Sequence, residues 1–271
     1  FTLKNVGFLG IDYQVDFMDL PNSALPVLGA NADAQSVAEW LTKFADQLTS
    51  LYLTQDSHHA LDIAHPSWWK DANGQLVNPF TAILPEDLTS GKFYPTVHPT
   101  TSVKYVNDLT AQGEYVHFIW PEHCLIGTEG HAFQKDIQKA VANFERKTGR
   151  WVNFVTKGSN PFTEHFGAFR ANIPQASDPS TQINQALLQQ LQTLDVLYFT
   201  GEARSHCVAN SLRQLCDEVP TLLPKLVILE DGMSDVPGLP APFYVGVQAI
   251  YDRAKSLGAQ FAKTTDFTTS I

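Results

Sequence analysis

Short apolar runs alternate with longer segments of helical periodicity along most of this chain, and no other feature of the sequence constrains the fold as strongly. The runs predict strands at residues 6–12, 51–54, 115–120, 151–156, 195–200, 226–229 and 259–263. The periodic segments predict helices at residues 34–49, 131–148, 181–191, 205–218 and 242–257. Strands rich in Val, Ile, Leu and Phe that alternate with helices are typical of a parallel sheet covered on both faces. We therefore expect an α/β fold with a doubly wound, six-stranded, mostly parallel sheet.

One segment, residues 57–114, departs from this rhythm. It is rich in Pro, His and Trp and shows little periodicity. A connection of this length is usually functional or forms a lid. The sequence contains no internal repeat, low-complexity tract or linker that would divide it. We expect one domain over residues 1–271, with a loop-rich insert at about 57–114.

Charge and composition exclude several classes of protein. The chain has 18 Lys and Arg against 28 Asp and Glu, a formal net charge of −10, whereas nucleic-acid binders usually carry a basic patch. No window approaches the roughly 18 consecutive apolar residues that a membrane span needs. Three cysteines do not indicate a disulfide scaffold. The first residues show no targeting signal. We expect a cytoplasmic protein that binds neither nucleic acid nor membrane.

Five of the predicted strands are followed by side chains that can act as a ligand, acid, base or nucleophile. Ligands bind at the carboxyl ends of the strands in open α/β sheets, so we expect these side chains to meet along one edge. They are Asp12, Asp56 with His58, His123 with Cys124, Lys157, and Cys207.

The second and third of these groups have the composition of a metal site. Asp56 and His58 are separated by one residue, so their side chains point the same way in an extended segment. His123 follows a strand that should be a neighbour. One carboxylate and two imidazoles can hold Zn²⁺, Fe²⁺ or Mn²⁺ with positions left open. His59 and His65 are spare ligands, and the alternative is a His-rich polar surface.

Cys207 stands at the start of the predicted helix 205–218, where backbone N–H groups and the helix dipole stabilise a thiolate. Cys216 lies nine positions later, roughly 900° around the helix axis, and cannot serve the same pocket. We interpret Cys216 and Cys124 as structural. Asp12 could be a general base and Lys157 its electrostatic partner, although each could equally be a turn residue or surface lysine.

The segments that carry these residues resemble those of the isochorismatase-like cysteine hydrolases, which include the nicotinamidases. The similarity lies in D-Y-Q-V-D-F at Asp12, D-S-H-H at Asp56, W-P-E-H-C at His123, and K-G-S-N-P-F-T-E-H-F-G-A-F at Lys157. It continues in G-E-A-R-S-H-C-V at Cys207. These segments follow one another in the family's order and span most of the chain.

The resemblance implies a catalytic triad of Asp12, Lys157 and Cys207, with the backbone N–H groups of Ala203 and Cys207 as the oxyanion hole. It also implies a divalent metal, Zn²⁺ first and Fe²⁺ or Mn²⁺ as alternatives, held by Asp56, His58 and His123. The Glu202–Ala203 peptide bond would be cis. Isochorismatases proper lack the cysteine nucleophile, so its presence favours amide hydrolysis, with nicotinamide as the substrate. An aromatic-lined pocket would suit this substrate, and the candidates for its wall are Phe17, Trp68, Trp120 and Phe169, each of which could equally be an ordinary core residue.

The sequence departs from the family pattern around the substrate. Arg204, Ser205 and His206 precede the cysteine, a second His-Pro pair adds His65 as a further candidate ligand, and the insert is long. Arg204 or His206 could therefore pair with a carboxylate on a more polar substrate. Two other functions stay open: an amidase of the same family for another amide or ureide, and a non-catalytic ligand-binding relative. Either would act on a small molecule, in a monomer or a homo-oligomer.

Overall fold

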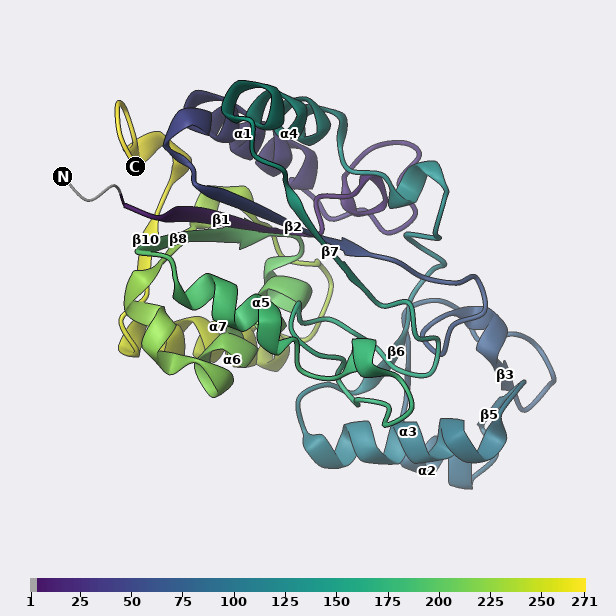
Figure 1. Ribbon diagram of the computed structural model, residues 1–271. Helices are drawn as coiled ribbons and strands as arrows, with labels where there is room; N and C mark the ends of the chain where they lie inside the picture. Colours follow the sequence, from purple (N-terminus) through teal and green to yellow (C-terminus); the bar gives the residue numbers. More distant parts are fainter. Residues whose placement is uncertain (1–3) are drawn as a thin grey trace.

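A six-stranded parallel sheet forms the centre of the molecule, which a computed structural model describes over residues 4–271 (Figure 1). The strand order is β10-β9-β8-β1-β2-β7, and every pair in it is parallel. The strands are β1 (Val6–Ile11), β2 (Ser50–Asp56), β7 (Asn153–Lys157), β8 (Val196–Gly201), β9 (Leu226–Leu229) and β10 (Gln260–Ala262). The predicted fold class is confirmed.

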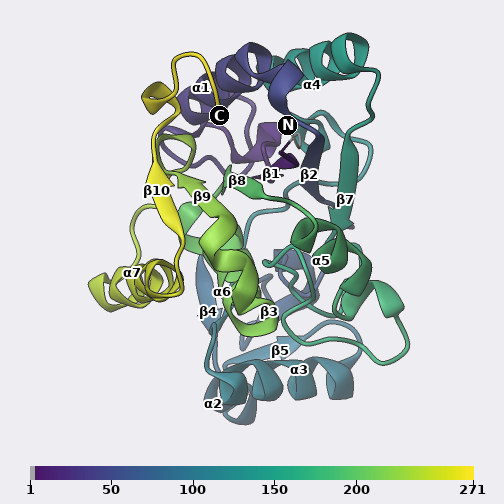
Figure 2. The same ribbon diagram turned by 60° about the vertical axis from the view of Figure 1, so that its left-hand side comes forward.

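Helices cover both faces of this sheet, as Figures 1 and 2 show. On one face lie α1 (Ala30–Lys43) and α4 (Lys135–Thr148), whose apolar sides share a core with β1 and β2. On the other lie α5 (Gln185–Gln192), α6 (Ala209–Glu218) and α7 (Ala241–Ser256), packed on β8 and β9. Because helices bury both faces, all six residues of β1 are buried, which explains its unbroken apolar sequence. No helix within residues 4–271 is long and apolar enough to cross a membrane.

The register of the sheet brings polar residues together at its carboxyl edge. Asp56 and Lys157 are direct partners on β2 and β7, the last pair of that ladder. Ile11 at the end of β1 is paired with Gly201 at the end of β8. Asp12 and Glu202, the residues that follow, therefore leave the sheet side by side.

The run at 115–120 does not join the sheet, so the prediction that His123 follows one of its strands is wrong. Its strand is β6 (His117–Ile119), which pairs antiparallel with β4 (Thr81–Ile83). Ile119 is buried in a separate apolar core that includes Ile83. The apolar character of this run thus reflects packing within residues 57–119 and not burial in the main sheet.

The insert has more regular structure than its weak periodicity suggests. It contains β3 (Trp69–Asp71) paired with β5 (Phe93–Pro95), and the helices α2 (Pro85–Thr89) and α3 (Pro99–Gln112). Trp68 and Trp69 are buried in its own apolar core. This layer lies beside the carboxyl ends of the main strands (Figure 1).

Candidate active site

Three charged side chains and a cysteine meet where β1, β2 and β7 end. Asp12 follows β1, while Asp56 and Lys157 are the last residues of β2 and β7. Cys207 lies in a π-helical turn, Arg204–Val208, between β8 and α6. All four side chains are buried. A buried charge is tolerated only when it is paired, so the folded structure depends on these charged side chains contacting one another.

Lys157 is the centre of this group. Its Nζ lies 2.8 Å from Asp12 Oδ2 and 3.4 Å from Asp56 Oδ1. It also donates to the carbonyl oxygen of His165 at 2.9 Å and to Cys207 Sγ at 3.6 Å. Burial alone would lower the pKa of Lys157, but the two carboxylates raise it well above its ordinary value. The ammonium therefore stays charged and ties two acids to the sulfur atom.

Asp12 is held in one orientation by Thr54. The Thr54 hydroxyl donates to Asp12 Oδ1 at 2.6 Å and accepts the Asp12 backbone N–H at 3.0 Å. The residue adopts a positive φ of 49°, an uncommon conformation for any residue but glycine. Oδ2 is thereby left to Lys157. Burial raises the pKa of Asp12 against the opposing effect of Lys157, so this carboxylate is a stronger base than an exposed aspartate.

Cys207 does not lie at the start of an α-helix, as the sequence predicts, but in the turn before it. The α-helix α6 begins at Ala209, so Cys207 precedes its first residue and lies within the π-helical turn. Burial raises the pKa of the Cys207 thiol, while Lys157 acts in the opposite direction. The resting thiol keeps its proton and needs a base nearby. Cys124 and Cys216 are also buried and unpaired with other cysteines.

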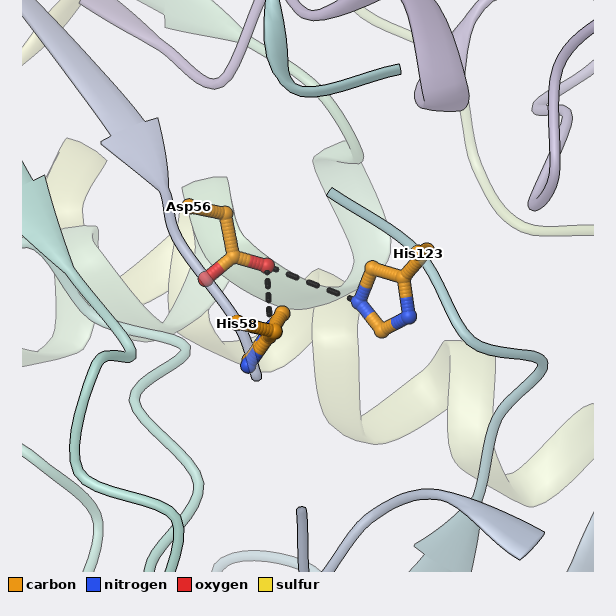
Figure 3. A group of neighbouring side chains, drawn as sticks. All are labelled: Asp56, His58 and His123. Atoms are coloured by element: carbon orange, nitrogen blue, oxygen red, sulfur yellow. Dashed lines mark hydrogen bonds and ion pairs between the residues drawn. The ribbon is translucent and has the colours of Figure 1, made fainter. Parts of the chain in front are cut away.

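Asp56, His58 and His123 form a second group beside the first (Figure 3). Asp56 Oδ2 lies 2.8 Å from His58 Nε2 and 3.5 Å from His123 Nε2, and the three ligand atoms lie within 4.8 Å of one another. The other ring nitrogens are occupied: His58 Nδ1 lies 3.3 Å from Asp62 Oδ2, and His123 Nδ1 donates to the Pro121 carbonyl at 2.8 Å. Both Nε2 atoms are thus free to coordinate. The group could hold a divalent metal.

The two spare histidines have different positions. The His65 ring lies 5.4 Å from that of His58 and 5.2 Å from that of His123, between centroids. Its Nε2 is buried without a hydrogen-bond partner, and burial lowers its pKa to about 4. A neutral imidazole with a free nitrogen is suited to metal binding, so His65 stays a candidate. His59 is exposed to solvent.

A small cavity joins the two groups. Asp56, His58 and His123 line it together with Ala203 and Cys207. Of the predicted aromatic wall residues, Phe17 and Trp120 line it. Trp68 and Phe169 do not: Trp68 is buried in the core of the insert, with its indole N–H bonded to Ser102, and Phe169 is buried in the core beneath α5 and α6.

The cavity also contains residues that our sequence reasoning missed. Glu164, His165 and Phe166 line it, and all three belong to the segment that resembles the family's lysine motif. Burial and the nearby carboxylate of Asp62 raise the pKa of Glu164 to about 8. The position of Glu164 within that segment is the sequence feature that could have identified it as a site residue.

The side chain of His206 points into the cavity, whereas that of Arg204 points away from it. Arg204 turns away from the cavity to Asp235, at 3.2 Å, and its guanidinium stacks over Tyr251. His206 lines the cavity. The suggestion that Arg204 could pair with a substrate carboxylate is therefore wrong. The Glu202–Ala203 peptide bond before them is cis, as the family resemblance implies.

Comparison with solved structures shows which class of fold this is. An Acinetobacter baumannii nicotinamidase/pyrazinamidase matches with a TM-score of 0.61 at 18% identity, over 97% of this chain and 98% of that one. The yeast nicotinamidase bound to nicotinaldehyde matches with a TM-score of 0.64 at 14% identity, over 95% and 99%. A Pyrococcus horikoshii pyrazinamidase in complex with zinc matches with a TM-score of 0.54 at 16% identity, over 96% and 100%.

The chain has the isochorismatase-like fold of the nicotinamidases and pyrazinamidases over nearly its full length. No family model matches the sequence. No curated protein matches it either. At these identities the likeness establishes the fold, and function has to be argued from the site.

Proposed function

We propose that this protein is a metal-assisted cysteine amidohydrolase that converts nicotinamide to nicotinate and ammonia. The observation that carries the proposal is the buried contact of Lys157 with Asp12, Asp56 and Cys207, on a cavity shared with His58 and His123. Solved structures of the same fold include nicotinamidases. A non-catalytic binding protein has no need of a buried acid, cation and thiol in contact.

The first half of the reaction uses the chain's own groups. Asp12 accepts the proton of the Cys207 thiol as the sulfur attacks the amide carbonyl carbon. The carbonyl oxygen becomes an oxyanion, which the backbone N–H groups of Ala203 and Cys207 stabilise, a contribution typically of about 3 kcal/mol per donor. Asp12 then returns its proton to the amide nitrogen. The C–N bond breaks, ammonia leaves, and the acyl group stays on Cys207 as a thioester.

The second half regenerates the enzyme. Asp12 accepts a proton from water, whose oxygen attacks the thioester carbonyl. The C–S bond breaks, the carboxylic acid leaves, and the proton returns to the sulfur atom. Lys157 stays charged throughout. Because it contacts both Asp12 and Cys207, it stabilises the negative charge on whichever of the two carries it.

Asp56, His58 and His123 would hold the metal, with His65 as a further candidate ligand. Zn²⁺ suits one carboxylate and two imidazoles, and the Pyrococcus horikoshii structure contains zinc. Bound there, the ion supplies a Lewis acid for a lone pair on the substrate, such as a pyridine nitrogen.

An ammonia-release assay with zinc-loaded protein tests the proposal on nicotinamide, pyrazinamide and benzamide. Benzamide keeps the ring and the carboxamide but lacks the ring nitrogen. We expect nicotinamide and pyrazinamide to react and benzamide to react far more slowly. Equal rates for benzamide and nicotinamide would contradict the contact between metal and ring nitrogen. Turnover of none of the three, with turnover of an aliphatic amide or ureide, would leave only the broader amidase assignment.

A further inference from the structure

A second, larger cavity adjoins the catalytic cavity. The catalytic cavity encloses about 40 Å³, while its neighbour has a volume of about 570 Å³. Trp120, Phe166 and His206 line both cavities, so the two lie directly side by side. The inner cavity is lined by Cys207 and the three candidate metal ligands, so the carboxamide and the ring beside it would lie there. The bulk of a larger substrate would have to lie in the outer one.

The walls of the outer cavity are almost entirely apolar. They come from the antiparallel pair β4 and β6, from the start of α7 and from the residues just before it, and include Ala82, Leu84, Val116, Phe118, Leu239 and Phe243. Glu114 is the charged residue among those that line it, and its carboxylate is paired with Arg170 at 3.6 Å and Arg213 at 3.3 Å. This lining suits an uncharged, apolar group.

The boundary between the cavities is also uncharged. The Ser205 hydroxyl oxygen accepts the backbone N–H of Val236 at 2.9 Å, which leaves its proton for His206 Nδ1, also at 2.9 Å. The His206 ring therefore carries its own proton on Nε2, and burial lowers its pKa to about 3, so it stays neutral. The ring stacks on Phe243 with 5.1 Å between centroids and lies edge-on to Trp120 at 5.2 Å. Aromatic faces thus continue from one cavity to the other.

We propose that the outer cavity receives an apolar extension of the acyl group, so that the preferred substrates are primary carboxamides larger than a single ring. This inference rests on the proposed amide hydrolysis. The reaction is unchanged: R–CO–NH₂ and water give R–COOH and ammonia, with the C–N bond broken and a C–O bond formed. The outer cavity shares Trp120, Phe166 and His206 with the catalytic one, and this direct adjacency favours a substrate group over a second copy of the chain as its occupant.

Matched pairs of amides test this inference. Nicotinamide is compared with 5-phenylnicotinamide, and butanamide with 4-phenylbutanamide. Burial of the added phenyl group should raise kcat/KM about ten- to hundredfold within a pair. Ala82→Phe places a ring at the lining of the outer cavity, where it competes with the added phenyl group for space, so the gain should fall below about threefold while the rate for the parent amide is unchanged. Ala72→Phe, at an exposed residue of the insert outside the cavity lining, is the control and should keep the gain.

Binding to the inactive Cys207→Ala protein separates this inference from the proposed function. Calorimetry should show the same tenfold or greater gain in affinity for 5-phenylnicotinamide over nicotinamide, lost when Ala82→Phe is added. If this gain appears but no amide releases ammonia, the hydrolysis is wrong and the outer cavity stands. Ammonia release without any gain in rate or affinity would overturn the inference. So would a gain that survives Ala82→Phe, or a change of oligomeric state caused by Ala82→Phe without any effect on the pairs.

Discussion

Lys157 is the residue on which the other groups of the site depend. Its ammonium contacts Asp12 and Asp56 and lies 3.6 Å from Cys207 Sγ. A single cation between two acids and a thiol lowers the free energy of each deprotonated partner. The removal of this charge should therefore be felt first at the sulfur atom, whose thiolate is otherwise disfavoured by burial.

Lys157→Met tests this role. The methionine side chain has a similar length without the charge, so the pKa of Cys207 should rise further and its reaction with iodoacetamide at pH 8 should slow at least about tenfold. Peptide mass spectrometry measures the alkylation rate at Cys207, and circular dichroism confirms that the variant is folded. An unchanged rate in a folded variant would mean that Lys157 does not act on the sulfur atom.

At the scale of elements, β1 and β8 approach too closely at their ends to admit a side chain. Gly201 has a φ of +152°, and a Cβ on it would meet the Ile11 carbonyl oxygen at 2.4 Å. Gly201→Ala should therefore destabilise the protein by about 2–3 kcal/mol and reduce activity, because Asp12 and Ala203 flank this contact. Gly246→Ala is the matched control: nothing lies within 4 Å of its Cβ position, and alanine in helix α7 should stabilise by up to about 1 kcal/mol. Urea denaturation measures both, and equal effects would contradict the packing argument.

His117, a buried histidine on β6 beside the insert, makes the stability of the protein depend on pH. His117 Nε2 bonds to the Ile63 carbonyl at 2.9 Å, and burial lowers the pKa of His117 to about 4 from 6.5. The unfolded chain therefore binds this proton at a higher pH than the folded one does. The contribution of His117 to the free energy of unfolding is therefore fully present above pH 6.5. It is lost as the pH falls towards 4, by up to about 3 kcal/mol.

His117→Gln keeps a donor for Ile63 without this titration. In metal-free protein, its urea midpoint should fall less between pH 7 and pH 4 than that of the wild type, whereas His59→Gln at an exposed position should behave as the wild type. Identical pH profiles for all three proteins would show that His117 contributes nothing.

The sequence predicted some elements for physical reasons and missed others for reasons just as definite. Asp12 and Asp56 follow runs that are apolar because both faces of the sheet are covered there, so their positions could be predicted. Lys157 ends the edge strand β7, which is largely exposed, and was predicted from its short apolar pair Phe154 and Val155. His123 was predicted near Asp56, but from a strand that belongs to a different sheet. The helix α3 was missed because Tyr105, Val106 and Leu109 form only a short apolar stripe. Trp68 and Phe169 were misplaced because composition cannot distinguish a core aromatic residue from one that lines a cavity.

At the scale of the whole molecule, we predict one divalent metal for each chain. Plasma mass spectrometry should find about one equivalent after purification and dialysis, and EDTA should lower both the melting temperature and the rate of ammonia release. His58→Ala should lose the metal, while His59→Ala, the adjacent exposed residue, should keep it. Absence of stoichiometric metal, with no effect of EDTA on stability or rate, would contradict the metal site.

The central claim is that Cys207 attacks the amide, and ammonia release from nicotinamide tests it most directly. The wild type, Cys207→Ala and Cys216→Ala are compared under the same zinc-loaded conditions, with melting temperatures to show that each is folded. We predict equal amounts of nicotinate and ammonia from the wild type, a loss of about a thousandfold or more in Cys207→Ala, and a rate within about twofold of the wild type in Cys216→Ala. Retention of more than a few per cent of the wild-type rate (about 5%) by Cys207→Ala, or a comparable loss in Cys216→Ala, would contradict the account.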